Sequence, residues 1–435
     1  GQLKTSRLKK VLIITYYWPP SGGAGVQRWL KFAKYLSEFG YQPIIYTPEN
    51  PEFPAIDQSL LDDIPEGIEI LKQPIWEPYN WYRQFLGQKD KKIGSGFVAE
   101  KKEPGLLHKI SVWVRGNFFI PDARRFWIKP SVKFLSDYLE KNEVDAVITT
   151  GPPHSMHLIG LALKKQLNIN WIADFRDPWT NIDFYKELML SGWADRKHKA
   201  LEKEVLQTAD KVITIGYTMT EEMKELGAKQ VETVTNGYDA DDFSSEAVTL
   251  DEDFTISHIG TFSPSRNHPN LWKALAQLKT EDPDFASKLK IRTVGVVDYT
   301  VASSITEYGL AENWERIDYV SHSEVLRYQK CSKVLLVSIN NTPNATGILP
   351  GKFFEYLASG RPILAVGPKQ SDIGTVLSKT SAGVIVERDD FAGIKDAVLA
   401  LFKEQNTARQ EAEIAKFSRQ GLTKELAQII QRVAN

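Results

Sequence analysis

The sequence predicts an α/β protein with two domains, each built on a parallel sheet. Its 435 residues exceed what a single hydrophobic core usually supports. Short apolar strands alternate with amphipathic helices along most of the chain, which is the pattern of parallel sheets. Hydrophobic residues at 42% and charged residues at 25% are ordinary for a globular protein. The net charge of −1 provides no overall field for nucleic acid, so we expect no nucleic-acid partner.

The first domain is expected to open with a strand at 11–16, a helix at 26–39 and a strand at 42–46. The glycine-rich turn between the first two elements contains Gly23 and Gly25. This turn would lie at the carboxyl edge of the sheet, where α/β proteins bind ligands. It lacks the Gly-x-Gly-x-x-Gly spacing, which disfavours a nicotinamide enzyme. A glycine turn without a ligand is the alternative.

Residues 72–133 form an insertion of different character. They contain thirteen bases against five acids, with eleven aromatic residues interleaved. Such a segment favours an anionic partner, for example a phospholipid surface or a lipid-pyrophosphate acceptor. The alternative is a solvated insertion with a partly buried aromatic face.

Polar residues follow the next two predicted strands, at 144–149 and 170–173. His154 comes after the first strand, and the second strand runs into a group of three charged residues, Asp174, Arg176 and Asp177. Both loops are expected to face one crevice and to supply an imidazole, a guanidinium and two carboxylates. A helix cap is the alternative for His154, and a buried ion pair is the alternative for the charged residues. A helix at 196–210 and a strand at 211–215 close this domain.

The second domain repeats this logic. A strand at 254–259 leads into a loop with Gly260 and Arg266. Further strands are expected at 292–296 and 334–339, and the tail 406–435 has apolar residues at helical spacing.

The most informative stretch is a glycine-rich loop at 347–351 that runs into a short helix. Glycines let backbone N–H groups approach an anion, and the helix N-terminus adds partial positive charge. Lys352 in the first turn would then face a phosphate. Glu355, one turn later, could accept hydrogen bonds from the hydroxyls of a ribose. The pattern indicates a site for a phosphorylated sugar nucleotide, and an ordinary helix with both side chains solvated is the alternative.

Four segments together, 22–25, 236–239, 260–266 and 347–355, resemble the retaining GT-B-fold glycosyltransferases of glycosyltransferase family 4. The match to a Pro-Gly-Lys-x-Phe-Glu-Tyr-Leu motif points to one branch of that family, and the resemblance covers nearly the full length. It implies an α/β, GT-B fold in which two Rossmann-like domains with parallel sheets face a cleft. The implied domains are an acceptor-side domain at 1–240 that includes the insertion 72–133, a nucleotide-sugar-binding domain at 241–405, and a C-terminal helix at 406–435 that crosses back to the first domain.

The resemblance also implies the reaction. A sugar would move from a nucleotide-sugar, most readily a UDP-sugar, to a saccharide or lipid-linked acceptor in surface polysaccharide or glycoconjugate synthesis. The expected donor-binding residues are Gly23, Gly25, Gly260, Arg266, Gly347, Ile348, Leu349, Gly351, Lys352 and Glu355. The family's first glutamate is replaced by Gly347, and the place of its active-site histidine holds 174–177. The candidate catalytic residues are therefore Asp174, Arg176, Asp177 and His154.

Two other function classes remain open at this point. One is a GT-B-fold sugar-nucleotide epimerase, and the other is a non-catalytic two-domain module that binds a sugar nucleotide. No cofactor or metal is expected, because cations and backbone amides would stabilise the leaving diphosphate. The single cysteine, Cys331, suits a reducing cytosol. The polar, basic residues 1–10 do not resemble a signal peptide, and no apolar run has the length of a membrane span. We expect a cytoplasmic protein, with peripheral contact at the inner face of the cytoplasmic membrane left open.

Overall fold

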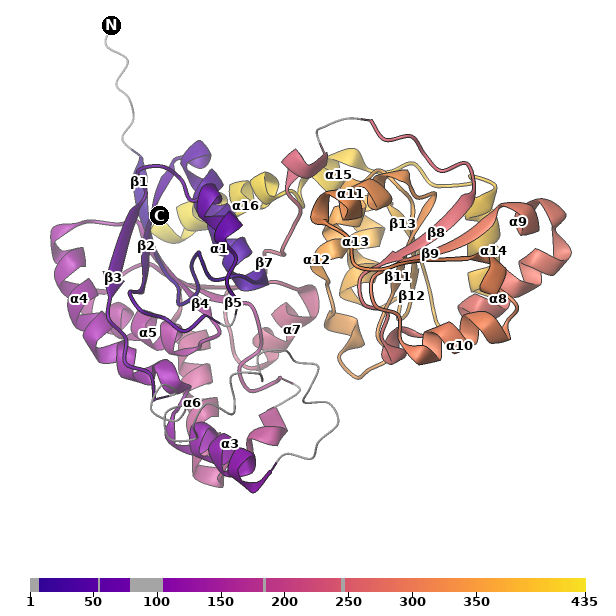
Figure 1. Ribbon diagram of the computed structural model, residues 1–435. Coiled ribbons are helices and arrows are strands. Elements are labelled where there is room, and N and C mark those ends of the chain that lie inside the picture. The colour runs from indigo at the N-terminus through magenta and orange to yellow at the C-terminus, as the bar shows by residue number, and fades with distance from the viewer. Residues whose placement is uncertain (1–7, 54, 79–104, 183–184, 244–246) are drawn as a thin grey trace, which may run out of the picture. The chain divides into compact units, whose positions relative to one another are not determined.

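The chain forms two compact units in the computed structural model, which describes residues 8–53, 55–78, 105–182, 185–243 and 247–435 (Figure 1). One unit comprises Gly1–Thr235 together with Thr423–Asn435, and the other comprises Asn236–Leu422. The second unit therefore runs past residue 405. The C-terminal residues belong to the first unit, where Arg432 forms a salt bridge of 3.0 Å with Glu232.

The first unit is built on a parallel sheet with the strand order β3-β2-β1-β4-β5-β6-β7. The order reverses between β1 and β4, and the carboxyl edge at such a reversal is where α/β sheets bind ligands. The strands are β1 (Lys9–Ile14), β2 (Tyr41–Pro48), β3 (Glu69–Gln73), β4 (Ala146–Gly151), β5 (Trp171–Phe175), β6 (Lys211–Thr214) and β7 (Val231–Thr233). The helices are α1 (Ala24–Tyr35), α3 (Leu106–Phe118), α4 (Ile128–Lys141), α5 (Ser155–Leu167), α6 (Gly192–Thr208), α7 (Tyr217–Glu225) and most of α16 (Arg419–Ala434).

Apolar strand residues form the core of this unit. The last four residues of β1 are fully buried, as expected for a parallel strand covered on both faces. Helices α4 and α5 lie side by side (Figure 1), and Leu135 of α4 packs with Ile159 and Leu163 of α5 in one cluster. A second cluster joins Phe175 of β5 to Val205 of α6.

The second unit is built on a parallel sheet with the order β10-β9-β8-β11-β12-β13. Here the order reverses between β8 and β11, so their loops flank the crevice. The strands are β8 (Phe254–Ile259), β9 (Leu289–Val294), β10 (Trp314–Ile317), β11 (Val334–Ser338), β12 (Ile363–Val366) and β13 (Gly383–Val386). The helices are α8 (Pro269–Glu281), α9 (Pro283–Lys288), α10 (Tyr299–Glu307), α11 (His322–Cys331), α12 (Gly351–Ala358), α13 (Asp372–Thr380), α14 (Phe391–Phe402) and α15 (Glu411–Ala415).

The predicted α/β fold with two parallel sheets is confirmed, and the differences concern element boundaries. The helix expected at 26–39 begins at Ala24 and tightens into a 3-10 turn at Leu36, before Gly40 ends it in a left-handed conformation with φ of 93°. The helix expected at 196–210 begins at Gly192, because the Ser191 side chain caps it. The helical tail is two helices, α15 and α16.

Residues 79–104 of the insertion 72–133 lie outside the described residues. Several of the bases and aromatic residues noted in the sequence belong to that segment. Its described part contains α3, a 3-10 turn at Ala123–Trp127 and the start of α4. None of the described helices has both the length and the apolar character needed to cross a membrane.

Candidate functional site

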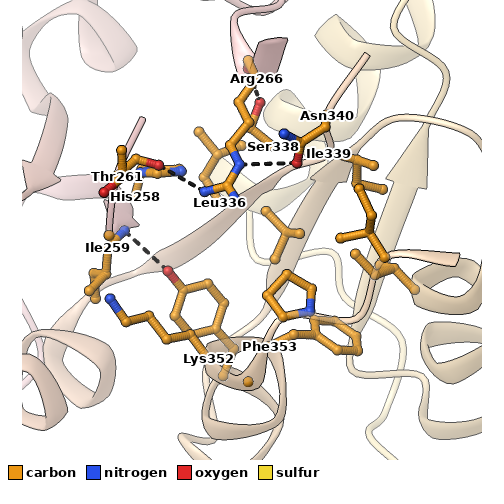
Figure 2. Close-up of a pocket in the computed structure, with 17 residues that line it drawn as sticks. His258, Ile259, Thr261, Arg266, Leu336, Ser338, Ile339, Asn340, Lys352 and Phe353 are labelled. Carbon is orange, nitrogen blue, oxygen red and sulfur yellow. Dashed lines mark hydrogen bonds between the residues drawn. The ribbon is translucent and has the colours of Figure 1, made fainter. Parts of the chain in front are cut away.

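A pocket of about 300 Å³ opens at the carboxyl edge of the second unit's sheet (Figure 2). The loops after β8 and β11 and the first turn of α12 line it, at the point where the strand order reverses. Five of the predicted donor-binding residues lie in its wall, namely Gly260, Arg266, Ile348, Gly351 and Lys352. Gly347 and Leu349 belong to the same loop without lining the pocket, and Glu355 lies one turn into α12.

Arg266 is held in the pocket by neutral acceptors. Its Nε donates to Asn340 Oδ1 at 3.1 Å, and its Nη1 donates to the Thr261 carbonyl at 2.8 Å (Figure 2). Within the described residues it forms no salt bridge with a carboxylate. Burial lowers the pKa of Arg266, and the nearby Tyr356 opposes this shift. The guanidinium is therefore fixed in place while its charge stays uncompensated, which suits it to bind an anion.

Lys352 reaches the pocket from the start of α12. Its Nζ lies over Gly260, where an added Cβ would be 3.0 Å away, and the φ of 109° at Gly260 also favours glycine. No hydrogen bond or salt bridge to Lys352 is found in the described part of the chain. Lys352 is exposed as a whole, but desolvation of its ammonium group lowers its pKa; Arg266 adds to this shift and Glu355 opposes it.

The first turn of α12 adds further positive potential. It contains no acidic residue, and no side chain caps its N-terminus. The positive end of the helix dipole thus lies beside Arg266 and Lys352. Two cations and a helix N-terminus in one pocket have the chemistry that binds an anion.

Glu355 is oriented by a residue that the sequence did not reveal. Gln329 in α11 is fully buried and donates from Nε2 to Glu355 Oε2 at 2.7 Å. The Oε1 of Gln329 has no hydrogen-bond partner among the described residues. One oxygen of the half-buried Glu355 carboxylate is therefore fixed by the hydrogen bond from Gln329. The two residues lie on different helices, so no local pattern could have linked them.

His258 is a second residue that the sequence analysis missed. It lies near the end of β8, lines the pocket and stacks on Phe262 with a centroid distance of 4.0 Å. Burial, followed by Arg266 and Lys352, lowers the pKa of His258 to about 3. The ring is therefore neutral at physiological pH. The position of His258 just before the end of a predicted strand could have indicated it. The same is true of Asn340, which lies just after β11.

Asp174 lies at the end of β5 in the first unit and is fully buried. It forms a salt bridge of 2.8 Å with the buried Arg28 of α1 and accepts hydrogen bonds from Trp29 Nε1 at 2.8 Å and Thr150 Oγ1 at 2.7 Å. The carboxylate thus joins α1, β4 and β5 below the surface. A buried ion pair was the alternative interpretation of Asp174. Such a pair is present, but its partner is Arg28, 146 positions away in sequence.

Arg176 meets the glycine-rich turn after β1. Its Nε donates to Thr150 Oγ1 at 3.1 Å, and its Nη2 contacts the Pro152 carbonyl. A Cβ at Gly25 would overlap the Arg176 guanidinium, so glycine is required for this contact. Gly23 precedes α1, is exposed and has a φ of 116°. Asp177 is exposed; desolvation raises its pKa, and Arg176 opposes that shift.

His154 lies beside a second histidine in the loop after β4. It stacks on Trp179 with a centroid distance of 4.9 Å, and His157 lies 5.8 Å away. Burial, followed by His157 and Arg176, lowers the pKa of His154 well below its usual value. His157 contacts Thr149 Oγ1 through Nδ1 at 2.8 Å, and burial lowers its pKa to about 3. Both rings are neutral, and His154 Nδ1 and His157 Nε2 have no hydrogen-bond partner among the described residues. The sequence analysis had singled out only His154.

Among the described residues, no group of three or more histidine, cysteine, aspartate or glutamate side chains could hold a metal ion. Cys331 is buried at the end of α11.

Residues 96–242 match the family model described as Glycosyltransferase Family 4. A search of curated protein sequences finds no significant match. Solved structures match over nearly the whole chain. Trehalose-6-phosphate synthase OtsA has a TM-score of 0.57 at 11% identity, covering 98% of this chain and 99% of that one. The lipopolysaccharide outer core galactosyltransferase WaaB in its apo form has a TM-score of 0.56 at 13% identity, covering 97% and 99%.

A third structure, HepE from Anabaena in complex with UDP-glucose, has a TM-score of 0.55 at 13% identity and covers 98% of this chain and all of that one. The fold is that of the GT-B glycosyltransferases. The candidate donor pocket and the His154 loop both follow strands at the points where the order of a GT-B sheet reverses.

Proposed function

We propose that this chain is a retaining glycosyltransferase that moves a sugar from a nucleotide-sugar, with UDP-sugar as first choice, to a saccharide or lipid-linked acceptor. One observation carries the proposal. The pocket at the β8/β11 reversal brings Arg266 and Lys352 together, and neither forms a salt bridge within the described residues. A diphosphate would supply the missing negative charge.

The pocket residues account for the chemistry of the leaving group. When the bond between sugar and phosphate breaks, negative charge develops on the diphosphate. In this proposal Arg266, Lys352 and the N–H groups that start α12 stabilise that charge. Glu355 accepts hydrogen bonds from the ribose hydroxyls. In this proposal the cations take the part that a divalent metal has in other transferases.

The uridine base is proposed from the named ligands of structures with the same fold. One of these structures is a complex with UDP-glucose, and another, S. aureus TarM with a TM-score of 0.50 and 11% identity, includes UDP. These ligands belong to those proteins. We extend their class to this chain because it shares their fold and has a pocket with two cations at the reversal of its second sheet.

The first unit is proposed as the acceptor side and the second as the donor side. Asp177, Arg176 and His154 would orient an acceptor hydroxyl or stabilise the developing oxocarbenium ion. Thr150 accepts from Arg176 and donates to Asp174, so Asp174 acts as a positioning residue behind them. The expected setting is synthesis of a surface polysaccharide or another glycoconjugate.

Calorimetric titration with UDP, GDP, ADP and uridine tests the donor pocket. The expected result is binding of UDP that is stronger than binding of uridine. Failure of every nucleoside diphosphate to bind refutes the proposal, and a preference for GDP corrects the base.

Turnover then separates the function classes. UDP release from a UDP-sugar that depends on an added saccharide or lipid-linked acceptor supports transfer. Conversion of one UDP-sugar into another without an acceptor identifies an epimerase, and binding without any turnover identifies a binding module. NMR of the product's anomeric configuration tests retention.

A further inference from the structure

The first unit exposes an unusual number of large apolar side chains around α3. Leu106 and Leu107 are 75% and 65% exposed. Single exposed apolar residues are normal, but a gathered group marks an interaction site. We name this group the α3 surface; it consists of Trp76, Leu106, Leu107, Ile110, Trp113, Phe118, Phe126, Met189 and Trp193.

Helix α3 exposes its large apolar side chains. Leu106, Ile110 and Trp113 are spaced as neighbours along one face of a helix and are all exposed. Asn117, by contrast, is buried; its side chain donates to the Met189 carbonyl at 3.3 Å and accepts from the Ser191 N–H at 2.6 Å. The buried residues of α3 are Ser111, Gly116 and Asn117, so small and polar residues hold the helix on the protein from its middle to its C-terminal end, whereas residues 105–110 are all exposed.

Aromatic contacts extend this face beyond the helix. Trp113 and Phe118 meet edge to face at 5.4 Å, and Trp76 and Phe126 do so at 4.9 Å. Arg125 joins the two pairs, because its Nη1 donates to the Phe118 carbonyl at 2.7 Å while its guanidinium lies 5.3 Å from the Phe126 ring. The segments on either side of α3 therefore belong to the same surface.

The described part of the insertion places positive charge beside the α3 surface. Lys109, Arg125 and Lys129 are exposed within or beside it. The two acids in the described part of the insertion are engaged with the protein. Glu77 pairs with Arg124 at 3.0 Å, and Asp122 accepts from the N–H and hydroxyl of Ser155 at 3.0 and 2.8 Å.

We infer that the α3 surface docks on an anionic lipid membrane. Its apolar side chains would enter the boundary between headgroups and acyl chains, and its lysine and arginine side chains would contact the phosphates. A helix of 13 residues with exposed large apolar side chains suits binding in the plane of the interface. The inference deepens the proposed function, on which it rests for the lipid-linked acceptor. The contact of Asp122 with Ser155, the residue after His154, ties this surface to the candidate acceptor loop.

Vesicle flotation with the full chain tests this inference. The expected result at low salt is binding to vesicles of equal parts phosphatidylglycerol and phosphatidylcholine, and little binding to phosphatidylcholine alone. The double variant Leu107→Ala/Trp113→Ala should bind the anionic vesicles at least about tenfold more weakly than the parent chain. Lys109→Gln/Lys129→Gln should weaken binding by about tenfold and reduce its salt dependence.

Matched variants outside the α3 surface serve as controls. Tyr319 is 92% exposed in the second unit, and Lys229 is exposed in the first. Tyr319→Ala and Lys229→Gln should bind vesicles like the parent chain. Because all these side chains are exposed, we expect the melting temperatures of the variants to equal that of the parent chain. Measuring them verifies that each variant is folded.

Three outcomes would overturn the membrane inference. The first is absence of binding of the parent chain to anionic vesicles at low salt, and the second is equal binding by the parent and the Leu107/Trp113 variant. The third is a dimer in solution that this variant converts to a monomer, which would assign the surface to a second copy of the chain. UDP titration without vesicles is independent of all three, so failure of the docking surface can be told apart from failure of the donor pocket.

Discussion

Replacing Lys352 by methionine should weaken donor binding without weakening the fold. Methionine keeps most of the side chain's length and removes its charge. The ammonium lies over Gly260 without a hydrogen bond or salt bridge in the described part of the chain. Desolvation and Arg266 lower its pKa below the ordinary 10.5, so in the absence of a ligand the folded protein disfavours this cation.

The size of the effect on binding follows from the distance to a bound phosphate. Two unit charges about 4 Å apart interact by about 1 kcal/mol in water and about 4 kcal/mol at an effective dielectric constant near 20. Lys352 is partly solvated, so we expect a loss of about 1.5–3 kcal/mol, or roughly 10- to 150-fold in the Kd for UDP. Uridine carries no phosphate, and its affinity should not change.

The sign of the effect on stability is opposite. Because the folded pKa is depressed, the unfolded state binds the proton more tightly. The cation therefore destabilises the fold at neutral pH, and this penalty disappears as pH rises through the interval between the folded pKa and 10.5. At neutral pH, Lys352→Met should have a melting temperature equal to or above that of the parent chain.

Calorimetry with UDP and uridine, together with thermal unfolding, provides the test. Lys403→Met is the matched control, since Lys403 is an exposed lysine after α14 and does not line the pocket. An unchanged Kd for UDP would refute the anion site. Equal losses for UDP and uridine, accompanied by a lower melting temperature, would show that Lys352 supports the fold of the loop.

Three further predictions address other residues. Glu355→Ala should weaken the binding of UDP and of uridine alike by about 1.5–3 kcal/mol in calorimetry. Gln329→Leu should raise the KM for the donor with little change in kcat. Unchanged affinities and an unchanged KM would show that Glu355 does not bind the ribose. The low pKa of His258 predicts a loss of stability as pH falls from 6.5 towards about 3, and urea unfolding of His258→Phe at neutral and acid pH should show a smaller loss than the parent chain. Asp177→Asn should lower turnover at least about tenfold at an unchanged melting temperature. Asp174→Asn should instead lower the free energy of unfolding by about 3–5 kcal/mol, because it removes the carboxylate charge that pairs with the buried Arg28. Loss of stability in the Asp177 variant and loss of turnover alone in the Asp174 variant would exchange their roles.

Local patterns in the sequence determined the fold class, and together with the family resemblance they named five of the residues that line the candidate donor pocket. Parallel strands that are buried on both faces appear as short apolar runs, as in β8, whose limits agree with the prediction. The residues after such strands meet at one edge of the sheet, and the family resemblance implied that Arg266 and Lys352 belong to one site there. Lys352 and Glu355 were found because they lie on the same short helix.

Only the tertiary structure decided which distant side chains meet. Gln329 reaches Glu355 across two helices, and Asp174 pairs with Arg28 of α1 and not with Arg176 two residues away. Such pairs depend on how elements pack across the sheet, which no local periodicity encodes. The same holds for α3: only the structure shows that its large apolar side chains are exposed while Ser111, Gly116 and Asn117 are buried.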